Sequence, residues 1–324
     1  MFTSAKTPWF IVAALHGITT TPSLAQDLSN QDRSMDIELV RPTFSRDSFL
    51  GVDHAVITKE GEFQAGILLQ YEKAPLRMIE RDIVTGAIVN HRQVIQLGLS
   101  YAPSKRFAAR LNIPIAGHWG NQVAEWTGDG FGVGDLFAGA RFHFGTWKGF
   151  SVGLHGDVGL PFSKKDAYMG ERLPRTVFGL LMSYDNGPLT VTTDIGPALR
   201  APVDNSAQDF KLGNELIWNT GISFLLPEEQ WSIDGSILIR GGFERFFVGA
   251  AENSMEWAAG VRYRPTQGIQ INGGIGRGIT QGYGTTGIRV MTGITFRYQP
   301  KDSIDDEPEL DVLISDMPDD EDLI

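Results

Sequence analysis

Apolar and polar residues alternate with a period of two along much of the chain, and residues 130–162 give the clearest case. Two arms place apolar side chains at every second position, with Asp135, Arg141, His143, His155 and Asp157 between them. A strand sends alternate side chains to opposite faces, whereas a helix would scatter these charges around its circumference. The pattern predicts an antiparallel hairpin.

Turn signals divide the rest of the chain in the same way. Short turns are predicted at 102–106, 145–149, 185–188, 227–230 and 265–268, and longer irregular breaks at 72–91, 119–130, 163–173, 201–211, 244–254 and 278–285. Short turns that alternate with long loops are typical of an up-and-down sheet with one end in the periplasm. The expected fold is therefore all-β, a transmembrane antiparallel up-and-down β-barrel of about 12 strands.

Aromatic residues favour this barrel over a soluble sandwich. Seven of them lie beside a short turn or at the closing end, and together they predict an aromatic girdle at one height: Tyr101, Phe144, Trp147, Tyr184, Trp231, Tyr263 and Tyr298. Pro114 and Pro197 count against strands, because proline cannot donate to a ladder. A soluble β-sandwich or lectin-like domain stays open as the alternative.

The polar face of the strands is predicted to line the lumen. Its charged residues are Arg110, Asp135, Arg141, His143, His155, Asp157, Asp194, Glu215, Asp234, Arg240, Glu256, Arg262 and Arg289, together with Glu72, Arg200, Arg264 and Arg297. Acids and bases nearly balance, which indicates cross-strand ion pairs and weak ion selectivity at most. Inward glycines either leave room for a solute or relieve curvature: Gly98, Gly139, Gly153, Gly196, Gly221, Gly260, Gly274 and Gly293.

The ends of the chain differ from the barrel. Residues 1–25 read as a signal peptide, with Lys6 before a short apolar run and small residues before Gln26. Residues 26–62 are expected as an N-terminal periplasmic segment at the barrel mouth, or partly threading it, before a barrel over 63–299. Residues 300–324 form an acidic tail, expected to be disordered, which holds most of the net charge of -11.

Several classes of function find no support in the residues. The chain has no cysteine, no apolar run long enough for a membrane helix, and no basic stripe for nucleic acid. Ser151, His143, His155 and Asp157 invite a lipid-modifying enzyme, but they face the lumen and no strained nucleophile turn accompanies them. We expect no enzyme, no catalytic residue, no cofactor and no metal site, since metal-ligand spacings and a calcium loop are absent.

Three short motifs resemble a known family. They are "RPTFSRDSFLGVD" from residue 41, "VNHRQVIQLGLSYAPSKRFAARLNIPI" from residue 89, and "GFGVGDLFAGARFHF" from residue 130. They resemble the N-terminal β-barrel of OmpA-family outer-membrane proteins. Members usually continue into a peptidoglycan-binding domain, which this sequence lacks after Tyr298, so wall anchoring is not carried over and no site residue is transferred.

The sequence thus predicts an outer-membrane barrel of a Gram-negative bacterium, acting as a narrow passive channel or a structural surface protein. Expected partners are outer-membrane lipid, a small polar solute and a periplasmic partner of the acidic tail, with no nucleic acid. A scaffold that binds partners through the tail or through outer loops bearing Trp119 and Trp126 remains an alternative.

Overall fold

The computed structural model describes residues 35–300, apart from 46, 58, 81–82, 122–127, 164–167, 206–209, 244–245 and 247–251. These residues belong to one compact unit. They contain strands and turns but no helix, and hence none long and apolar enough to cross a membrane. The predicted signal peptide and most of the acidic tail lie outside the described residues.

The strands follow one another in the order that the alternation predicts. Their bounds are β1 (Glu62–Glu80), β2 (Ile83–Ser104), β3 (Phe107–Trp119), β4 (Gly130–Val133), β5 (Leu136–Trp147), β6 (Phe150–Leu160), β7 (Arg175–Asn186), β8 (Leu189–Leu199), β9 (Val203–Asn205), β10 (Phe210–Leu212), β11 (Glu215–Leu225), β12 (Trp231–Gly242), β13 (Ser254–Thr266), β14 (Ile269–Gly278) and β15 (Ile288–Tyr298). All except β9 and β10 belong to one sheet, and those two pair with each other.

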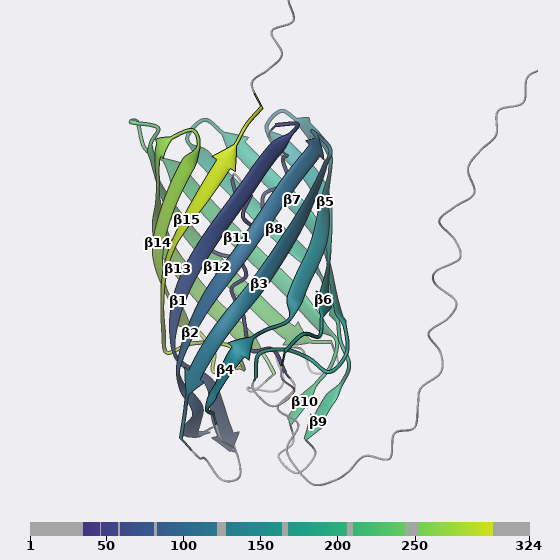
Figure 1. Ribbon diagram of the computed structural model, residues 1–324, viewed down its shortest axis with the longest axis vertical. Helices are drawn as coiled ribbons and strands as arrows, with labels where there is room; N and C mark the ends of the chain where they lie inside the picture. Colours follow the sequence, from purple (N-terminus) through teal and green to yellow (C-terminus); the bar gives the residue numbers. More distant parts are fainter. Residues whose placement is uncertain are drawn as a thin grey trace, which may run out of the picture. The chain divides into compact units, whose positions relative to one another are not determined.

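The large sheet closes on itself (Figure 1). The first strand pairs with the last, with Phe63 opposite Tyr298. Strand β3 pairs with β5 over one half and with β4 over the other, so β4 and β5 act as one interrupted strand. The result is a closed antiparallel barrel of 12 strands, which leaves no open sheet edge to hydrocarbon along most of its wall.

Pro114 and Pro197 both lie in the wall, in β3 and β8. Pro114 stands where β4 gives way to β5, and its carbonyl accepts the N–H of Gly134 at 2.8 Å. The interruption therefore falls beside a residue that cannot donate a ladder bond of its own.

One predicted break is wrong. Residues 72–91 were expected to be irregular, yet β1 and β2 continue through them as one long hairpin that pairs as far as Glu80 and Ile83. The register shifts between Lys73 and Leu76, where Ala74 takes a positive φ of 51°. Each bulge moves the following side chains to the other face, so the period of two is lost in the sequence although the strands continue.

The two faces of the barrel have opposite character. Outward side chains are apolar and exposed, such as Leu69, Ile222 and Ile233, and inward ones are polar and buried, such as Gln70, Ser223 and Asp234. A soluble sandwich would bury its apolar face against a second sheet. Here the apolar face is the outer surface of a single closed sheet, as lipid requires.

Candidate functional site

The lumen of the barrel is filled by the chain's own N-terminal residues. We call residues 35–61, apart from 46 and 58, the plug segment; Figure 1 shows it as the purple trace inside the barrel. At one end Asp36 bridges to Met169 in the β6–β7 loop, and at the other the N–H of Gly61 donates to the carbonyl of Ala102 at 2.7 Å. The segment thus reaches from the end with long loops, the long-loop end, to the end with short turns, the short-turn end.

The plug segment turns back on itself inside the barrel. Phe49 and Val52 exchange two backbone hydrogen bonds, of 3.1 and 2.9 Å. The residues between them, Leu50 and Gly51, have φ values of 45° and 81°. Positive φ at both central positions defines a tight turn of type I′, for which glycine is suited and leucine is unusual.

Glycines in the wall receive the large side chains of the segment. A Cβ atom added at Gly66 or Gly98, which lie opposite each other on β1 and β2, would overlap the ring of Phe44. A Cβ at Gly221 would lie 2.6 Å from the ring of Phe49, and one at Gly274 would lie 2.9 Å from Leu50. These inward glycines leave space in the lumen, but the space is occupied by side chains of the plug segment and not left for a solute.

The carboxylate of Asp53 holds the segment near the short-turn end. Arg141 donates to it at 2.6 Å, and Arg110 donates to its other oxygen. On the wall, Asp157 accepts two further bonds from Arg110, of 2.7 and 2.5 Å. The ring of His155 lies 2.9 Å from Asp157 and 2.9 Å from Asp194.

A second ionic group holds the segment near the long-loop end. The Glu38 carboxylate accepts from Arg92 at 2.9 Å and from Arg289 at 3.3 Å. Both arginines also pair with wall carboxylates, since Arg92 reaches Glu72 at 3.1 Å and Arg289 reaches Glu256 at 2.6 Å. All of these side chains are almost completely buried, so removal of one partner would leave a charge without water or a counter-charge.

A third group ties loops of the long-loop end to the wall. Arg200 pairs with Glu171 at 2.8 Å and with Glu215 at 3.2 Å, and Arg175 reaches Glu215 at 3.4 Å. The phenol of Tyr283, in the β14–β15 loop, donates to Glu215. Burial, with the nearby Glu215 carboxylate, raises the pKa of Tyr283 to about 12, so the phenol stays protonated.

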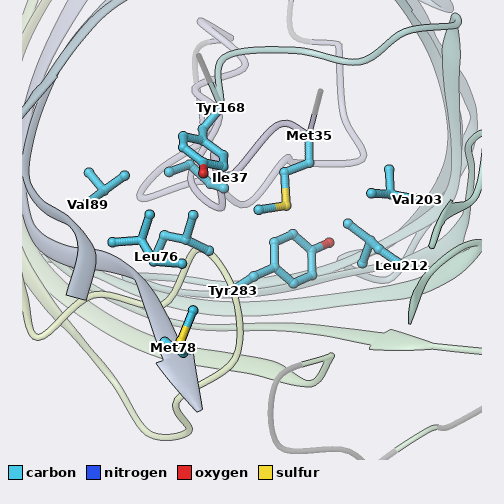
Figure 2. Packing of buried hydrophobic residues seen from close by; sticks show 10 residues of the cluster. Met35, Ile37, Leu76, Met78, Val89, Tyr168, Val203, Leu212 and Tyr283 are labelled. Atoms are coloured by element: carbon cyan, nitrogen blue, oxygen red, sulfur yellow. The ribbon is translucent and has the colours of Figure 1, made fainter. Parts of the chain in front are cut away.

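An apolar cluster at the long-loop end shares Tyr283 with this third group. Figure 2 shows the first residues of the plug segment packed against the strands and loops around them. The cluster consists of Met35, Ile37, Leu76, Met78, Ile88, Val89, Tyr168, Val203, Leu212 and Tyr283. It combines the extended part of the β1–β2 hairpin with three loop regions, so the plug segment helps to order the long-loop end.

Seven of the charged residues predicted for the lumen contact the plug segment. They are Arg110, Arg141, His143, Arg240, Arg262, Arg264 and Arg289. Five pair with other wall or loop residues: His155, Asp157, Asp194, Glu215 and Asp234. Glu256 pairs with Arg289, and Asp135 accepts backbone N–H groups of Phe162, Ser163 and Glu171 and so anchors the β6–β7 loop.

Five charged residues of the ionic groups were not predicted as site residues, and one of them, Glu171, lies inside the break predicted at 163–173. Glu38 and Asp53 precede the first strand, where no periodic pattern assigns a face. Arg92 directly follows the break predicted at 72–91, and Arg175 begins β7 just after the break predicted at 163–173. The sequence carried one usable signal. Arg92 lies two residues before Val94 and four before Gln96, so strand alternation would have placed all three on the same, inward face.

The seven girdle aromatics lie near the short-turn end, as positions beside the turns require, and six of them are exposed. Trp147 and Tyr298 are 60% and 66% exposed, and Tyr263 is half-buried because it stacks on Trp231 at 4.3 Å between ring centroids. Exposed aromatics also occur at the opposite strand ends, where the sequence predicted no girdle. They include Trp119, Phe131, Phe162 and Phe243.

Ser151 and His155, which suggested catalysis, are bound to other wall side chains. The Ser151 hydroxyl lies 2.8 Å from that of Thr146, and both ring nitrogens of His155 face aspartates. Among the described residues no group of three or more histidine, aspartate or glutamate side chains is arranged to hold a metal ion.

Two cavities border the plug segment. One, of about 50 Å³, lies between the Phe49–Val52 turn and β14 and β15, and the other, of about 10 Å³, lies beside Arg141 and Ile57. A water molecule needs roughly 10–15 Å³ of such volume, so the first cavity has room for a few waters and the second for about one. Neither is large enough for a sugar or an amino acid.

Comparison with known proteins gives a fold but no family. No protein-family model and no curated protein matches the chain. The COG4313 outer membrane channel from Pseudomonas putida F1 aligns with a TM-score of 0.63 at 12% identity, over 75% of this chain and 98% of that one. The fold is that of outer-membrane channels. NanC porin aligns with a TM-score of 0.51 at 12% identity, over 72% of this chain and 98% of the porin.

Proposed function

We propose that this chain is a porin-like channel of the bacterial outer membrane, and that small polar solutes pass when the plug segment moves aside. The observation that carries the proposal is a barrel with an apolar outer face and a polar lumen, occupied by a segment that belongs to no strand. Barrels of this kind place their short turns in the periplasm. The plug segment would then enter β1 from the periplasmic side.

The expected selectivity of the open channel is weak. Wall arginines and wall carboxylates occur in similar numbers and pair with one another, as in the Arg110–Asp157 and Arg289–Glu256 pairs. A strongly selective pore carries a ring of one sign. Solute size is therefore the main filter in this proposal.

Planar-bilayer recording of the refolded protein tests the proposal. Wild-type protein should give rare or small current steps, and a variant that lacks residues 35–56 should give frequent, larger ones, because its lumen is no longer filled. Heat-modifiable gel mobility establishes that each variant is a folded barrel. A folded deletion variant that passes no current would contradict the channel function.

A structural surface protein is the second candidate. It is favoured by the buried ion pairs at Glu38 and Asp53, which hold the segment at two levels of the lumen. In that case the barrel would never conduct, and the bilayer experiment decides between the two. The chain would not be an enzyme in either case.

Two sequence-based expectations remain proposals. The OmpA-family resemblance rests on short motifs in and before the first strands, and the outer-membrane barrel fold is compatible with it. The acidic tail would contact a basic periplasmic partner, which loss of a co-purifying protein after deletion of residues 302–324 would support. An unchanged pull-down would count against such a contact.

A further inference from the structure

Asp53 occupies a site built for a carboxylate. Besides the two arginines, its oxygens accept from Ser45 at 3.1 Å, from Ser48 at 2.7 Å and from the backbone N–H of His54 at 2.9 Å. The side chain is 3% exposed. Charge-assisted bonds from two guanidinium groups are the strongest recognition of a carboxylate that side chains provide.

The two arginines differ in what else holds them. Arg110 keeps its two bonds to Asp157, which is part of the wall. Among the described residues, the hydrogen-bond acceptors of Arg141 all belong to the plug segment: the Ser45 hydroxyl at 3.1 Å, Asp53 at 2.6 Å and the His54 carbonyl at 2.7 Å. Its Nε atom has no partner in the described part of the chain.

Movement of the segment would therefore leave Arg141 on the inner wall with its charge unmatched. A buried arginine without a partner is strongly unfavourable, so the site would recruit an anion or fill with water. Arg141 already borders the cavity of about 10 Å³, which gives it contact with space on the short-turn side.

The site around Glu38 does not share this property. Without Glu38, Arg92 keeps Glu72, and Arg289 keeps both Glu72 and Glu256. Its arginines stay paired when the segment moves, so this site provides a matched control inside the same lumen.

We propose that Arg110 and Arg141 form a binding site for a carboxylate, which Asp53 fills in the closed state and a carboxylate-bearing solute fills when the plug segment is displaced. The solute carboxylate and Asp53 then compete for one pair of guanidinium groups. The solute part of this inference rests on the proposed channel function, whereas the carboxylate site itself does not.

Chemical rescue tests the site without requiring conduction. In full-length Asp53→Ala, sodium acetate should raise the midpoint of thermal unfolding beyond the effect of sodium chloride at equal ionic strength. The acetate effect should disappear in Asp53→Ala/Arg141→Gln and should be absent in Glu38→Ala. An equal rise in the unfolding midpoint of Asp53→Ala in acetate and in chloride would overturn the proposed carboxylate site.

If Asp53→Ala does not fold, the variant without residues 35–56 replaces it, and acetate is titrated into the detergent-solubilised protein by calorimetry. Acetate should bind to this variant, and Arg141→Gln in the same background should weaken binding by at least about tenfold, as loss of one partner of a buried charge pair does. Absence of binding, or binding that Arg141→Gln leaves unchanged, would again overturn the site.

Current recording then tests the solute. In the deletion variant, glucuronate should interrupt the current at concentrations where glucose does not, and Arg141→Gln should remove these interruptions while Arg92→Gln retains them. Equal behaviour of glucuronate and glucose in a conducting variant would overturn the solute inference and leave the channel intact. A folded but silent variant would overturn the channel function and the solute inference together, with the acetate experiments still deciding the site.

Discussion

The ring of Phe44 occupies the space that a side chain at Gly98 would need. Phe44 has a φ of 46°, a conformation that costs an ordinary residue about 1 kcal/mol or more. The strain is tolerated because Gly98 and its partner Gly66 provide a flat surface for the ring. The wall and the plug segment are thus shaped for each other at this point.

Gly98→Ala should therefore loosen the plug segment. Overpacking of this kind costs roughly 1–3 kcal/mol, which would raise the ratio of open to closed states by a factor of about 5 to about 150. The measurement is the open probability in planar bilayers.

Gly242→Ala is the matched control for this change, because no described atom lies within 4 Å of a Cβ added there. It should leave the open probability unchanged. Equal open probabilities for Gly98→Ala and wild type would show that Phe44 does not hold the segment in place.

Arg289 should be the most costly wall residue to replace. It pairs with Glu38, Glu72 and Glu256, all of them buried, so Arg289→Met leaves three carboxylates short of a partner. Breaking a buried pair costs about 3–5 kcal/mol, and the free energy of unfolding in urea should fall by that order.

Arg264→Gln serves as the comparison for Arg289→Met. The Arg264–Asp47 pair has a separation of 3.4 Å and side chains that are 22% and 32% exposed, and partly exposed pairs contribute up to about 1 kcal/mol. If both variants lost equal stability, the buried network would not be the main anchor of the segment.

Tyr283 should give the long-loop end of the barrel a sensitivity to alkaline pH. Its pKa is raised from 10.0 to about 12 in the folded protein, so folding favours the protonated phenol. The stabilisation is complete below pH 10 and is lost as the pH rises from 10 towards 12. The difference in unfolding free energy between wild type and Tyr283→Phe should be constant from pH 7 to 9 and should change above pH 10. A difference that stays constant up to pH 12 would contradict this assignment.

The barrel could be predicted from the sequence because its strands carry the signal locally. In β15 the residues Val290, Ile294 and Phe296 alternate with polar positions, and the same pattern repeats from hairpin to hairpin. Lipid on one side and a polar lumen on the other impose this period of two. The prediction failed at the β1–β2 hairpin, where bulges near Ala74 move the side chains that follow to the other face of the same strand.

The filled lumen could not be predicted in the same way. Asp53 meets Arg110 and Arg141, which lie far along the chain, and nothing near Asp53 repeats with a period that would assign it a face. The inward glycines carried a partial signal. Gly98 indicated space in the lumen, but the sequence did not say that Phe44 fills it.

The central claim is that the plug segment must move for solutes to pass. The N–H of Ala55 in the segment donates to the Ser183 hydroxyl of β7 at 2.9 Å, so a short, reducible thiol crosslinker is expected to join cysteines placed at these two positions. The chain has no cysteine of its own. Single-channel recording of Ala55→Cys/Ser183→Cys, with each single variant as control, is the most direct measurement. The account predicts no current steps while the two cysteines are joined and their return on reduction. Equal current before and after reduction of a fully crosslinked protein would contradict it.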